Sequence, residues 1–154
     1  GRAGFGDIGK GKYFFKDKKF DTVLCLNVLE HIEKDKQALR NLYKLLTDGG
    51  YLILLVPAHS FLFGMIDKSI GHFRRYDKEL LVNNLEKIGF EIISMRIVNF
   101  LGAIGWYFFS KILKNKSVEE KNIKVFNLMA PIFLSFENFI EPPIGTSILA
   151  IAKR

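Results

Sequence analysis

The chain has 154 residues, of which 49% are hydrophobic and 25% charged; this composition is typical of one globular domain and excludes a disordered protein. The formal net charge of +7 comes from lysines scattered along the sequence, without a long basic run or zinc-ligand spacing, so we expect a lysine-rich surface and no nucleic-acid partner. A basic face that meets an anionic substrate or membrane is the alternative.

Residues 1–19 are expected to be an irregular start, although they are rich in glycine. Gly4, Gly6 and Gly9 satisfy the GxGxxG pattern, but a dinucleotide fingerprint needs a strand before it and a helix after it, and only three residues precede Gly4 here. The Walker A pattern also fails, because Tyr13 stands where Ser or Thr would ligate magnesium. Neither nucleotide-binding motif is therefore predicted.

A strand, a helix and a second strand are predicted next. Residues 20–28 and 51–56 are continuous apolar runs of strand length, and apolar residues between positions 38 and 46 recur at helical spacing. This βαβ unit should have parallel strands and a right-handed crossover. Cys25 lies in the first run, so we expect a buried thiol in a reducing compartment, the cytoplasm.

The second half of the chain should add a helix and two strands. A polar and aromatic loop, residues 58–76, leads to Asp77, which is expected to cap a helix, and strands are predicted over residues 91–98 and 148–152. Residues 100–140 are expected to form a helical, aromatic insertion before the last strand. Neither apolar half of it reaches the ~20 residues of a spanning helix. A plain core, a lid over an acceptor pocket and a lipid-facing surface all remain open for it.

Polar side chains follow both strands of the βαβ unit. Asn27, Glu30 and His31 come after the first strand, and His59 comes after the second. The carboxyl ends of neighbouring parallel strands form the ligand-binding edge of an α/β sheet, so His31 and His59 are expected to face one crevice. The alternative for His31 is a residue that only packs or caps a helix, and Glu30 would then be a solvated carboxylate at the helix start.

The loop sequence GHFRRY contains two adjacent arginines, Arg74 and Arg75, that should point to different faces. One guanidinium could form an internal ion pair while the other binds a carboxylate or phosphate. The alternative is a loop pinned by arginine–carboxylate pairs, with Glu30 or Asp67 as the partner. No metal site is predicted, because the three histidines lack a tight carboxylate cluster in the sequence.

Several short motifs together resemble the C-terminal two-thirds of the class I S-adenosylmethionine-dependent methyltransferases. In chain order they are GDI, FDTVLCLNVLEHI, LL followed by GG, LILLVPAH, GHFRRYDKELL, GF and the terminal SILAIAKR. The resemblance implies an α/β fold with a partial Rossmann-like sheet. Its strands would be parallel except for an antiparallel C-terminal strand inserted beside the preceding one, with helices on both faces and the first two strands absent. PAH followed by GHFRRY also looks like a bacterial and archaeal subgroup linked to glycolipid or polysaccharide pathways.

The resemblance also implies S-adenosylmethionine as the cofactor and a set of site residues. Asp7 would accept from the adenine amino group, with Ile8 beside the ring. The methionine part of the cofactor would be lined by Asn27, Val28 and Leu29. The acceptor would be faced by three candidate general bases, which are His31, His59 and His72. The remaining candidate substrate-binding residues are Arg74, Arg75 and Tyr76.

The sequence lacks the E/DxGxGxG turn of this family, so we expect a single truncated methyltransferase domain over residues 1–154 that binds the cofactor weakly or not at all. The strand of residues 20–28 would then be an open edge, covered by a second copy of the chain in a homodimer, by residues 1–19 or by domain swapping. The expected reaction is methyl transfer to a small-molecule, sugar or lipid-linked acceptor, with peripheral membrane contact as an open option. A non-catalytic binding fragment and a nicotinamide-dependent Rossmann enzyme are the alternatives.

Overall fold

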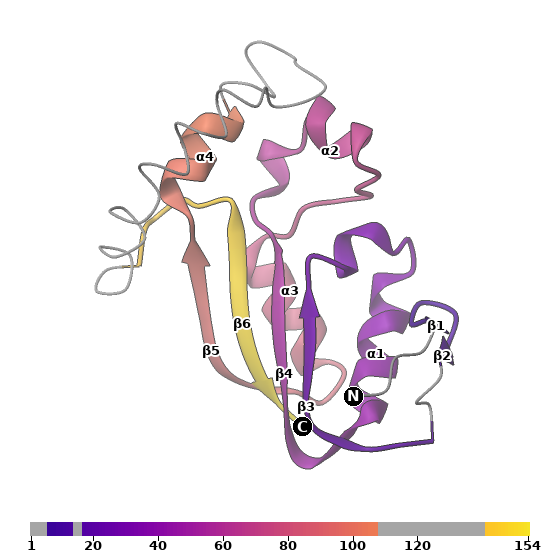
Figure 1. The fold of residues 1–154 in the computed structure, drawn as a ribbon. Helices are drawn as coiled ribbons and strands as arrows, with labels where there is room; N and C mark the ends of the chain where they lie inside the picture. Colours follow the sequence, from indigo (N-terminus) through magenta and orange to yellow (C-terminus); the bar gives the residue numbers. More distant parts are fainter. Residues whose placement is uncertain (1–5, 14–16, 108–140) are drawn as a thin grey trace.

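The structure is a computed structural model that describes residues 6–13, 17–107 and 141–154 (Figure 1). In chain order, its elements are β1 (Gly6–Asp7), β2 (Lys12–Tyr13), β3 (Phe20–Leu26), the 3-10 turn η1 (Leu29–His31), α1 (Asp35–Leu45), β4 (Leu46–Pro57), the 3-10 turn η2 (Ser60–Leu62), α2 (Met65–Ser69), α3 (Lys78–Glu86), β5 (Glu91–Val98), α4 (Phe100–Tyr107) and β6 (Ser147–Lys153).

Four of these strands form one mixed sheet in the order β3-β4-β6-β5. β3 and β4 are parallel, with Cys25 opposite Leu54, and β6 runs antiparallel to both of its neighbours. This arrangement confirms the parallel βαβ unit and the antiparallel last strand inserted beside the preceding one. The expected strands of residues 91–98 and 148–152 are present as β5 and β6, the latter one residue longer at each end.

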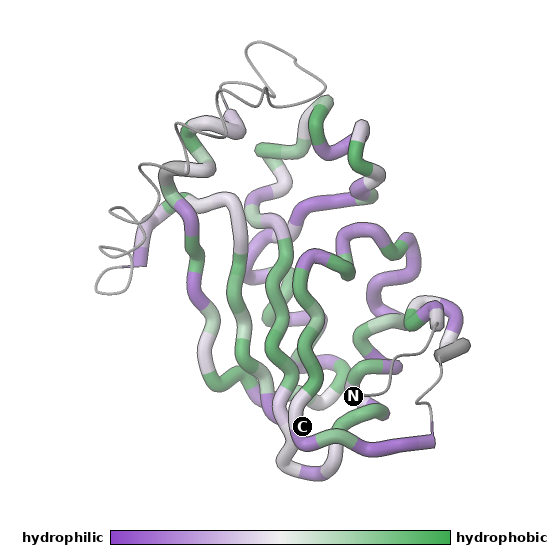
Figure 2. Tube along the Cα trace, in the orientation of Figure 1, coloured by the Kyte–Doolittle hydropathy of each residue, from purple (hydrophilic) through white to green (hydrophobic). Residues whose placement is uncertain are grey.

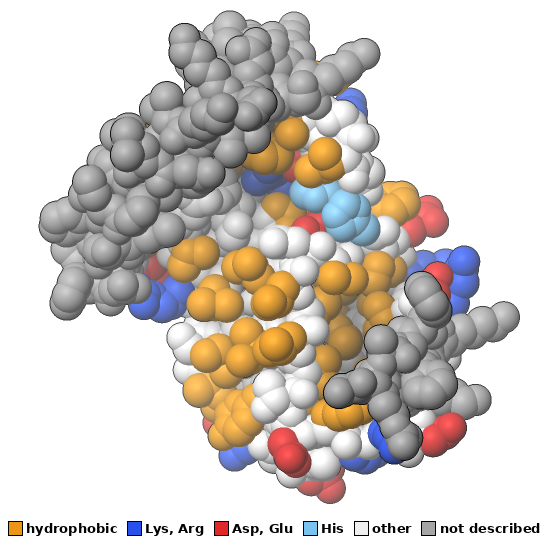
Figure 3. All heavy atoms as spheres, viewed as in Figure 1, with side chains coloured by type: hydrophobic (Ala, Val, Ile, Leu, Met, Phe, Trp, Pro, Cys, Tyr) orange, Lys and Arg blue, Asp and Glu red, His pale blue; other side chains and the backbone are white. Residues whose placement is uncertain are grey.

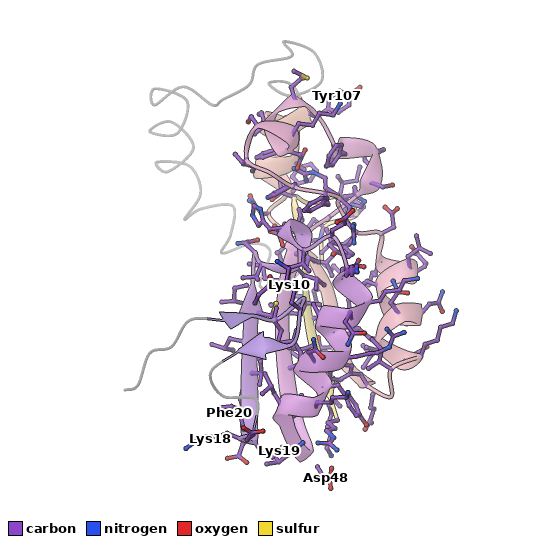
Figure 4. The ribbon with its side chains drawn as sticks, turned by 90° about the vertical axis from the view of Figure 1, so that its right-hand side faces the viewer. Lys10, Lys18, Lys19, Phe20, Asp48 and Tyr107 are labelled. Atoms are coloured by element: carbon purple, nitrogen blue, oxygen red, sulfur yellow. The ribbon has the colours of Figure 1, made fainter. Side chains whose placement is uncertain are left out.

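Helices α1 and α3 cover one face of the sheet and bury the core against it (Figures 1 and 4). The alternation of the strands sends every second side chain to this face. The buried strand residues are Leu52, Leu54 and Val56 of β4 and Ile148, Ala150 and Ala152 of β6. Ala38, Leu39 and Leu42 of α1 meet them from the helix side at the 3.6-residue period. Cys25 is 4% exposed, as its apolar context predicted.

The opposite face of the sheet is apolar and carries no helix among the described residues. Leu24 and Leu26 of β3 are 61% and 46% exposed, and Tyr51 of β4 is 40% exposed. Hydrophobic colour runs the length of the strands in Figure 2, and hydrophobic side chains spread across this face in Figure 3. The sequence implied helices on both faces; within the described part, α1 and α3 both lie on the same one.

The N-terminal stretch differs from the irregular start expected from the sequence. β1 and β2 pair antiparallel as a minimal hairpin, with Gly6 opposite Tyr13. They do not extend the main sheet, so β4 is the single strand partner of β3 within the described residues. An added Cβ at Gly9 would lie only 2.7 Å from Cγ2 of Ile32, so the hairpin packs closely beside the end of η1.

Most of the aromatic insertion, residues 108–140, lies outside the described residues. The described part, α4, is helical as expected. Across the described ranges, we find no helix with the length and apolar character needed to cross a bilayer. α4 stands at the end of the sheet opposite to Asp48 and Lys19, as the labels of Figure 4 show.

Candidate active site

The chain leaves β3 through a sharp turn at Asn27. Its backbone has a positive φ of 52°, a conformation that asparagine tolerates better than most residues, and its N–H donates to the Leu55 carbonyl at 2.9 Å. Asn27 and Val28 are exposed beyond this turn. Leu29 is fully buried in the core, so its side chain cannot line a ligand as expected, and only its backbone remains near the rim.

Glu30 and His31 of η1 meet His72, which lies more than 40 positions further along the chain. One potential ligand atom from each of the three residues lies within 4.8 Å of the others. Nε2 of His72 is 3.9 Å from Oε1 of Glu30, and the rings of His31 and His72 pack edge to face with centroids 4.6 Å apart. Two backbone-linked contacts hold this approach, from Phe73 N–H to the Glu30 carbonyl at 2.8 Å and between His31 Nδ1 and the Gly71 carbonyl at 3.3 Å.

The Glu30 carboxyl group is 1% exposed, and its Oε2 has no hydrogen-bond partner among the described residues. Burial raises the pKa of Glu30, and the neighbouring His72, His31 and Arg75 act against this shift. The alternative considered from the sequence, a solvated Glu30 at the helix start, is therefore wrong, because Glu30 is buried. Figure 3 shows the imidazoles gathered on the molecular surface above the apolar face of the sheet.

Asp67 is the buried centre that positions this group, and it is 0% exposed. Its Oδ1 accepts from Nδ1 of His72 at 3.0 Å and from Nε of Arg75 at 2.9 Å. Its Oδ2 accepts from the Gly64 amide at 2.9 Å, and Nε1 of Trp106 donates to it at 3.4 Å. The sequence pointed to Asp67 only as an arginine partner, because the contact with His72 depends on the turn that follows α2.

Arg75 is structural, contrary to the expectation that it binds substrate. Besides Asp67, its guanidinium donates to the Ala58 carbonyl at 3.2 Å and stacks over the Trp106 ring with 4.5 Å to the centroid. Burial lowers the pKa of Arg75, opposed by the adjacent Asp67 carboxylate. The alternative of a loop pinned by an arginine–carboxylate pair with Asp67 is the arrangement observed.

Arg74 and Tyr76 are also tied into the protein, through Asp35. Arg74 forms a 2.8 Å ion pair with Asp35 and donates to the Glu33 carbonyl at 2.8 Å. Tyr76 is only 5% exposed. Its hydroxyl oxygen lies 3.2 Å from Oδ2 of Asp35 and 3.3 Å from the Leu29 carbonyl oxygen. Burial raises the pKa of Tyr76. These contacts attach the loop to η1 and α1. The polar groups of Arg74 and Tyr76 are therefore already engaged within the protein in the absence of a ligand.

His59 does not join the other two histidines. It has a positive φ of 60°, and its ring packs against Phe61 with centroids 5.2 Å apart. Its Nε2 is buried without a partner among the described residues, and burial lowers the pKa of His59. The single crevice expected for His31 and His59 is replaced by a pair of His31 and His72, with His59 beside a separate apolar cleft.

That cleft has a volume of about 270 Å³ and lies between η2 and α4. Its lining is formed by Phe61, Leu62, Phe100, Ala103, Ile104, Tyr107 and Ile144. Trp106 extends from the same helix to Asp67, so α4 borders both the cleft and the group that positions His72. An apolar ligand portion in the cleft would therefore have ionisable side chains nearby.

Asp7 and Ile8 lie in the β1–β2 hairpin. Oδ1 of Asp7 accepts from the amides of Gly9 and Lys10 at 2.9 and 3.1 Å, and these contacts with Lys10 and Gly9 lower the pKa of Asp7. The Ile8 carbonyl accepts from Asn41 of α1 at 2.6 Å, which ties the hairpin to the main body. Asp7 keeps 48% of its side chain exposed, so the carboxylate can still accept from a ligand amino group.

The residues present fit part of S-adenosylmethionine. Asp7 offers an exposed carboxylate, which suits an amino group of adenine, and Asn27 and Val28 offer an exposed polar and apolar surface. Leu29 does not take part through its side chain. Of the five residues that the resemblance implied, Asp7, Asn27 and Val28 are exposed, Ile8 is half-buried and Leu29 is buried.

Comparisons with known proteins find methyltransferase domains both by sequence and by structure. A family model described as a methyltransferase domain matches residues 4–52. An uncharacterized protein of Methanocaldococcus jannaschii is 35% identical over 117 residues, which cover 73% of this chain and 51% of that protein. The chain thus spans about half the length of the curated relative it matches.

Solved structures extend the likeness to nearly the whole chain. An S-adenosylmethionine-dependent methyltransferase from Mesorhizobium loti has a TM-score of 0.57 at 14% identity, covering 97% of this chain and 68% of that one. A SAM-dependent methyltransferase from Archaeoglobus fulgidus gives 0.54 at 19% identity, covering 97% and 66%. The N-methyltransferase NodS from Bradyrhizobium japonicum, in complex with S-adenosylhomocysteine, gives 0.52 at 14% identity, covering 96% and 51%.

The sheet order β3-β4-β6-β5 with its antiparallel insertion, the domain match over residues 4–52 and these structural likenesses agree with one another. The chain has the fold of the class I S-adenosylmethionine-dependent methyltransferases.

Proposed function

We propose that the protein transfers a methyl group from S-adenosylmethionine to an acceptor held at the carboxyl ends of β3 and β4. The observation that carries this proposal is the cluster of Glu30 and His31, which follow β3, with His72 of the loop before α3, close to the exposed Asn27 and Val28. In α/β sheets this edge is where ligands bind. The activity is proposed for the whole protein, because the matched relative is about twice as long as the matched region.

Bound S-adenosylmethionine supplies an electrophilic methyl group. In this chain, Asn27 and Val28 would hold the methionine part near the end of β3, and Asp7 would accept from the adenine amino group. These residues orient the donor, and orientation is the main contribution expected for an in-line displacement.

His72 is the side chain best arranged to take a proton from an acceptor hydroxyl or amine. Oδ1 of Asp67 also accepts from Nε of Arg75, so Nδ1 of His72 is assigned as its second donor and Nε2 of His72 holds the free lone pair. His31 is exposed beside it and could bind the same acceptor. His59 is a weaker candidate, because its Nε2 is buried beside Phe61.

The acceptor class favoured by the structure is one with an apolar portion, such as a lipid-linked sugar or a glycolipid. The support is the cleft of about 270 Å³, whose lining residues are all apolar, together with its position beside α4. A small sugar without such a portion would leave this surface unused. Peripheral contact with a membrane is part of the same proposal, since a lipid-linked acceptor would be presented there.

The test is methyl transfer by the full-length protein. Purified protein is incubated with S-adenosylmethionine labelled in its methyl group and with separate lipid, glycolipid and free-sugar fractions. We expect label in a lipid-containing fraction and a loss of transfer in His72→Gln. Calorimetric titration of S-adenosylmethionine into the same protein is run in parallel. The absence of both cofactor binding and transfer would refute the proposal, whereas binding with transfer only to free sugar would refute its acceptor class.

A further inference from the structure

Glu30, His31 and His72 form a set of side chains suited to a metal ion, and we call it the Glu-His-His cluster. Two imidazoles and one carboxylate are typical ligands of zinc and of other divalent transition metals. One potential ligand atom from each lies within 4.8 Å of the others. The sequence could not reveal this set, because His72 is brought close to Glu30 and His31 only by the fold of the loop between α2 and α3.

The buried carboxylate gives an independent reason to expect a cation. Glu30 is 1% exposed, yet its Oε2 has no hydrogen-bond partner among the described residues. A buried polar oxygen without a partner is unfavourable, and buried charges in proteins are normally paired or coordinate metals. Its Oε1 is already 3.9 Å from Nε2 of His72.

His72 is held in the form that binds metals. Asp67 accepts the Nδ1 hydrogen at 3.0 Å, which leaves the lone pair of Nε2 directed to the Glu30 side. A carboxylate behind a ligating histidine fixes its tautomer and orientation in many metal sites. Asp67 is itself fixed by Arg75 and by the Gly64 amide, so the support is rigid.

We infer that the Glu-His-His cluster binds a divalent transition metal ion, with Zn²⁺ as the best match, through the Glu30 carboxylate and one ring nitrogen each of His31 and His72. Metal–ligand bonds of 2.0–2.2 Å in a tetrahedral site place ligand atoms about 3.4 Å apart. The 3.9 Å between Glu30 and His72 needs only a small contraction. His31 is exposed and can rotate to complete the set, with Nε2 available because Nδ1 faces the Gly71 carbonyl.

Three protein ligands leave a coordination position open to a substrate oxygen or to water. An ion there lowers the pKa of a bound hydroxyl and would take over the role proposed above for His72 as a base. Glu30 and His31 follow Asn27 after β3, so the open position would lie at the same carboxyl edge of the sheet as the proposed acceptor. The binding of the ion itself does not depend on methyl transfer.

The experiment measures metal binding by this chain without cofactor or acceptor. The protein is stripped with a chelator and titrated with Zn²⁺ by calorimetry and with Co²⁺ by visible absorption. We expect one ion per chain. Glu30→Gln and His72→Ala should each weaken binding by at least about a hundredfold, because outer-sphere partners alone contribute ten- to a hundredfold. The matched control is His59→Gln, a histidine outside the cluster, which should bind as the unsubstituted chain does.

His31→Ala keeps the test decisive if a buried substitution prevents folding, because His31 is exposed. It should weaken Zn²⁺ binding at least about tenfold and alter the Co²⁺ spectrum. Failure of the unsubstituted chain to bind either ion would overturn the inference, as would binding that survives His31→Ala. Equal losses in His59→Gln would also overturn it, since the ion would then lie elsewhere.

Discussion

At the scale of single residues, Asp67 is the side chain on which the loop between β4 and α3 depends. It is fully buried and is shared by Arg75, His72 and the Gly64 amide. The sequence indicated Asp67 only as one of two candidate partners of an arginine. The fold makes it the counter-charge of a buried arginine, and a buried pair is costly to break because one charge is left uncompensated.

We therefore predict that Asp67→Ala lowers the free energy of unfolding by about 3–5 kcal/mol, since it leaves Arg75 buried without its partner. Urea denaturation followed by circular dichroism measures this loss. Asp48→Ala is the control, because Asp48 also pairs with an arginine, Arg154 at 3.1 Å, but is 95% exposed. A similar loss in both variants would contradict the role given to Asp67.

A second prediction at this scale concerns Cys25, whose burial raises the pKa of its thiol to about 11. In the unfolded chain the pKa of a cysteine thiol is about 8.5. Between this value and the folded pKa, the folded state therefore keeps a proton that the unfolded chain loses. Stability is therefore complete below about pH 8.5 and falls as the pH rises toward the folded value. Urea unfolding at pH 8 and pH 10 should show this decrease, and Cys25→Ala should flatten it.

The native thiol should also react slowly with a disulfide reagent at pH 8, because the thiolate is the reactive form and Cys25 is 4% exposed. Complete labelling should require denaturant. Rapid labelling of the folded chain would show that the β3 face carrying Cys25 opens easily, and would count against the packing described for α1.

At the scale of elements, boundaries follow from local backbone chemistry. β3 ends at Leu26 because Asn27 takes a positive φ of 52°, and α3 gives way to β5 through Gly89, with a φ of 114°. Asp77 occupies the N-cap position of α3 as predicted, but its side chain accepts from the Ser60 amide at 3.0 Å and not from the helix. The residue type was informative, and the partner depended on the neighbouring loop.

We predict opposite effects for two glycine-to-alanine substitutions. Gly89→Ala places a Cβ 3.1 Å from the Tyr43 hydroxyl oxygen at a φ of 114°, so it should destabilise the fold by about 1–3 kcal/mol. Gly105→Ala in α4 meets no atom within 4 Å and should stabilise the helix by up to about 1 kcal/mol. Thermal unfolding of both variants checks the pair; a stabilised Gly89→Ala would contradict the left-handed turn.

At the scale of the whole molecule, the sheet presents one covered and one open face. Leu24 is 61% exposed and Leu26 46%, and β3 has a free edge within the described residues. A large apolar patch and an unpaired edge strand favour association. The open edge expected from the sequence is therefore the edge of β3. The strands β1 and β2 pair with each other and add no strand to this edge.

We predict that the chain self-associates at micromolar concentration through this face. Light scattering after size-exclusion chromatography should report a dimer or larger species, and the double variant Leu24→Lys, Leu26→Lys should be monomeric. Leu80→Lys is the matched control, because Leu80 is 62% exposed but lies on α3, on the other side of the sheet. If the unsubstituted chain is monomeric, the prediction is wrong. If Leu80→Lys disrupts association equally, the contact does not lie on the face that carries Leu24 and Leu26.

The sequence determined the elements of this protein. Apolar runs of strand length, a helical repeat between them and glycine turns located β3, α1, β5 and β6 to within a few residues, since hydrophobic periodicity and turn chemistry are local properties. It also carried the motifs that resemble the methyltransferases. The longer extent of β4 and the short β1–β2 hairpin were missed, because pairing of so few residues is set by neighbours and not by pattern.

Only the tertiary structure decided which side chains act together. His72 joins Glu30 and His31 through a loop closed by Asp67, whereas His59, equally prominent in the sequence, turns to Phe61. Arg74 and Arg75 look like ligand-binding residues in sequence, yet Arg74 pairs with Asp35 of a distant helix and Arg75 pairs with Asp67 of its own loop. The contacts of His72 with Glu30 and of Arg74 with Asp35 join residues 42 and 39 positions apart, so they depend on the path of the whole chain, which local residue preferences do not encode.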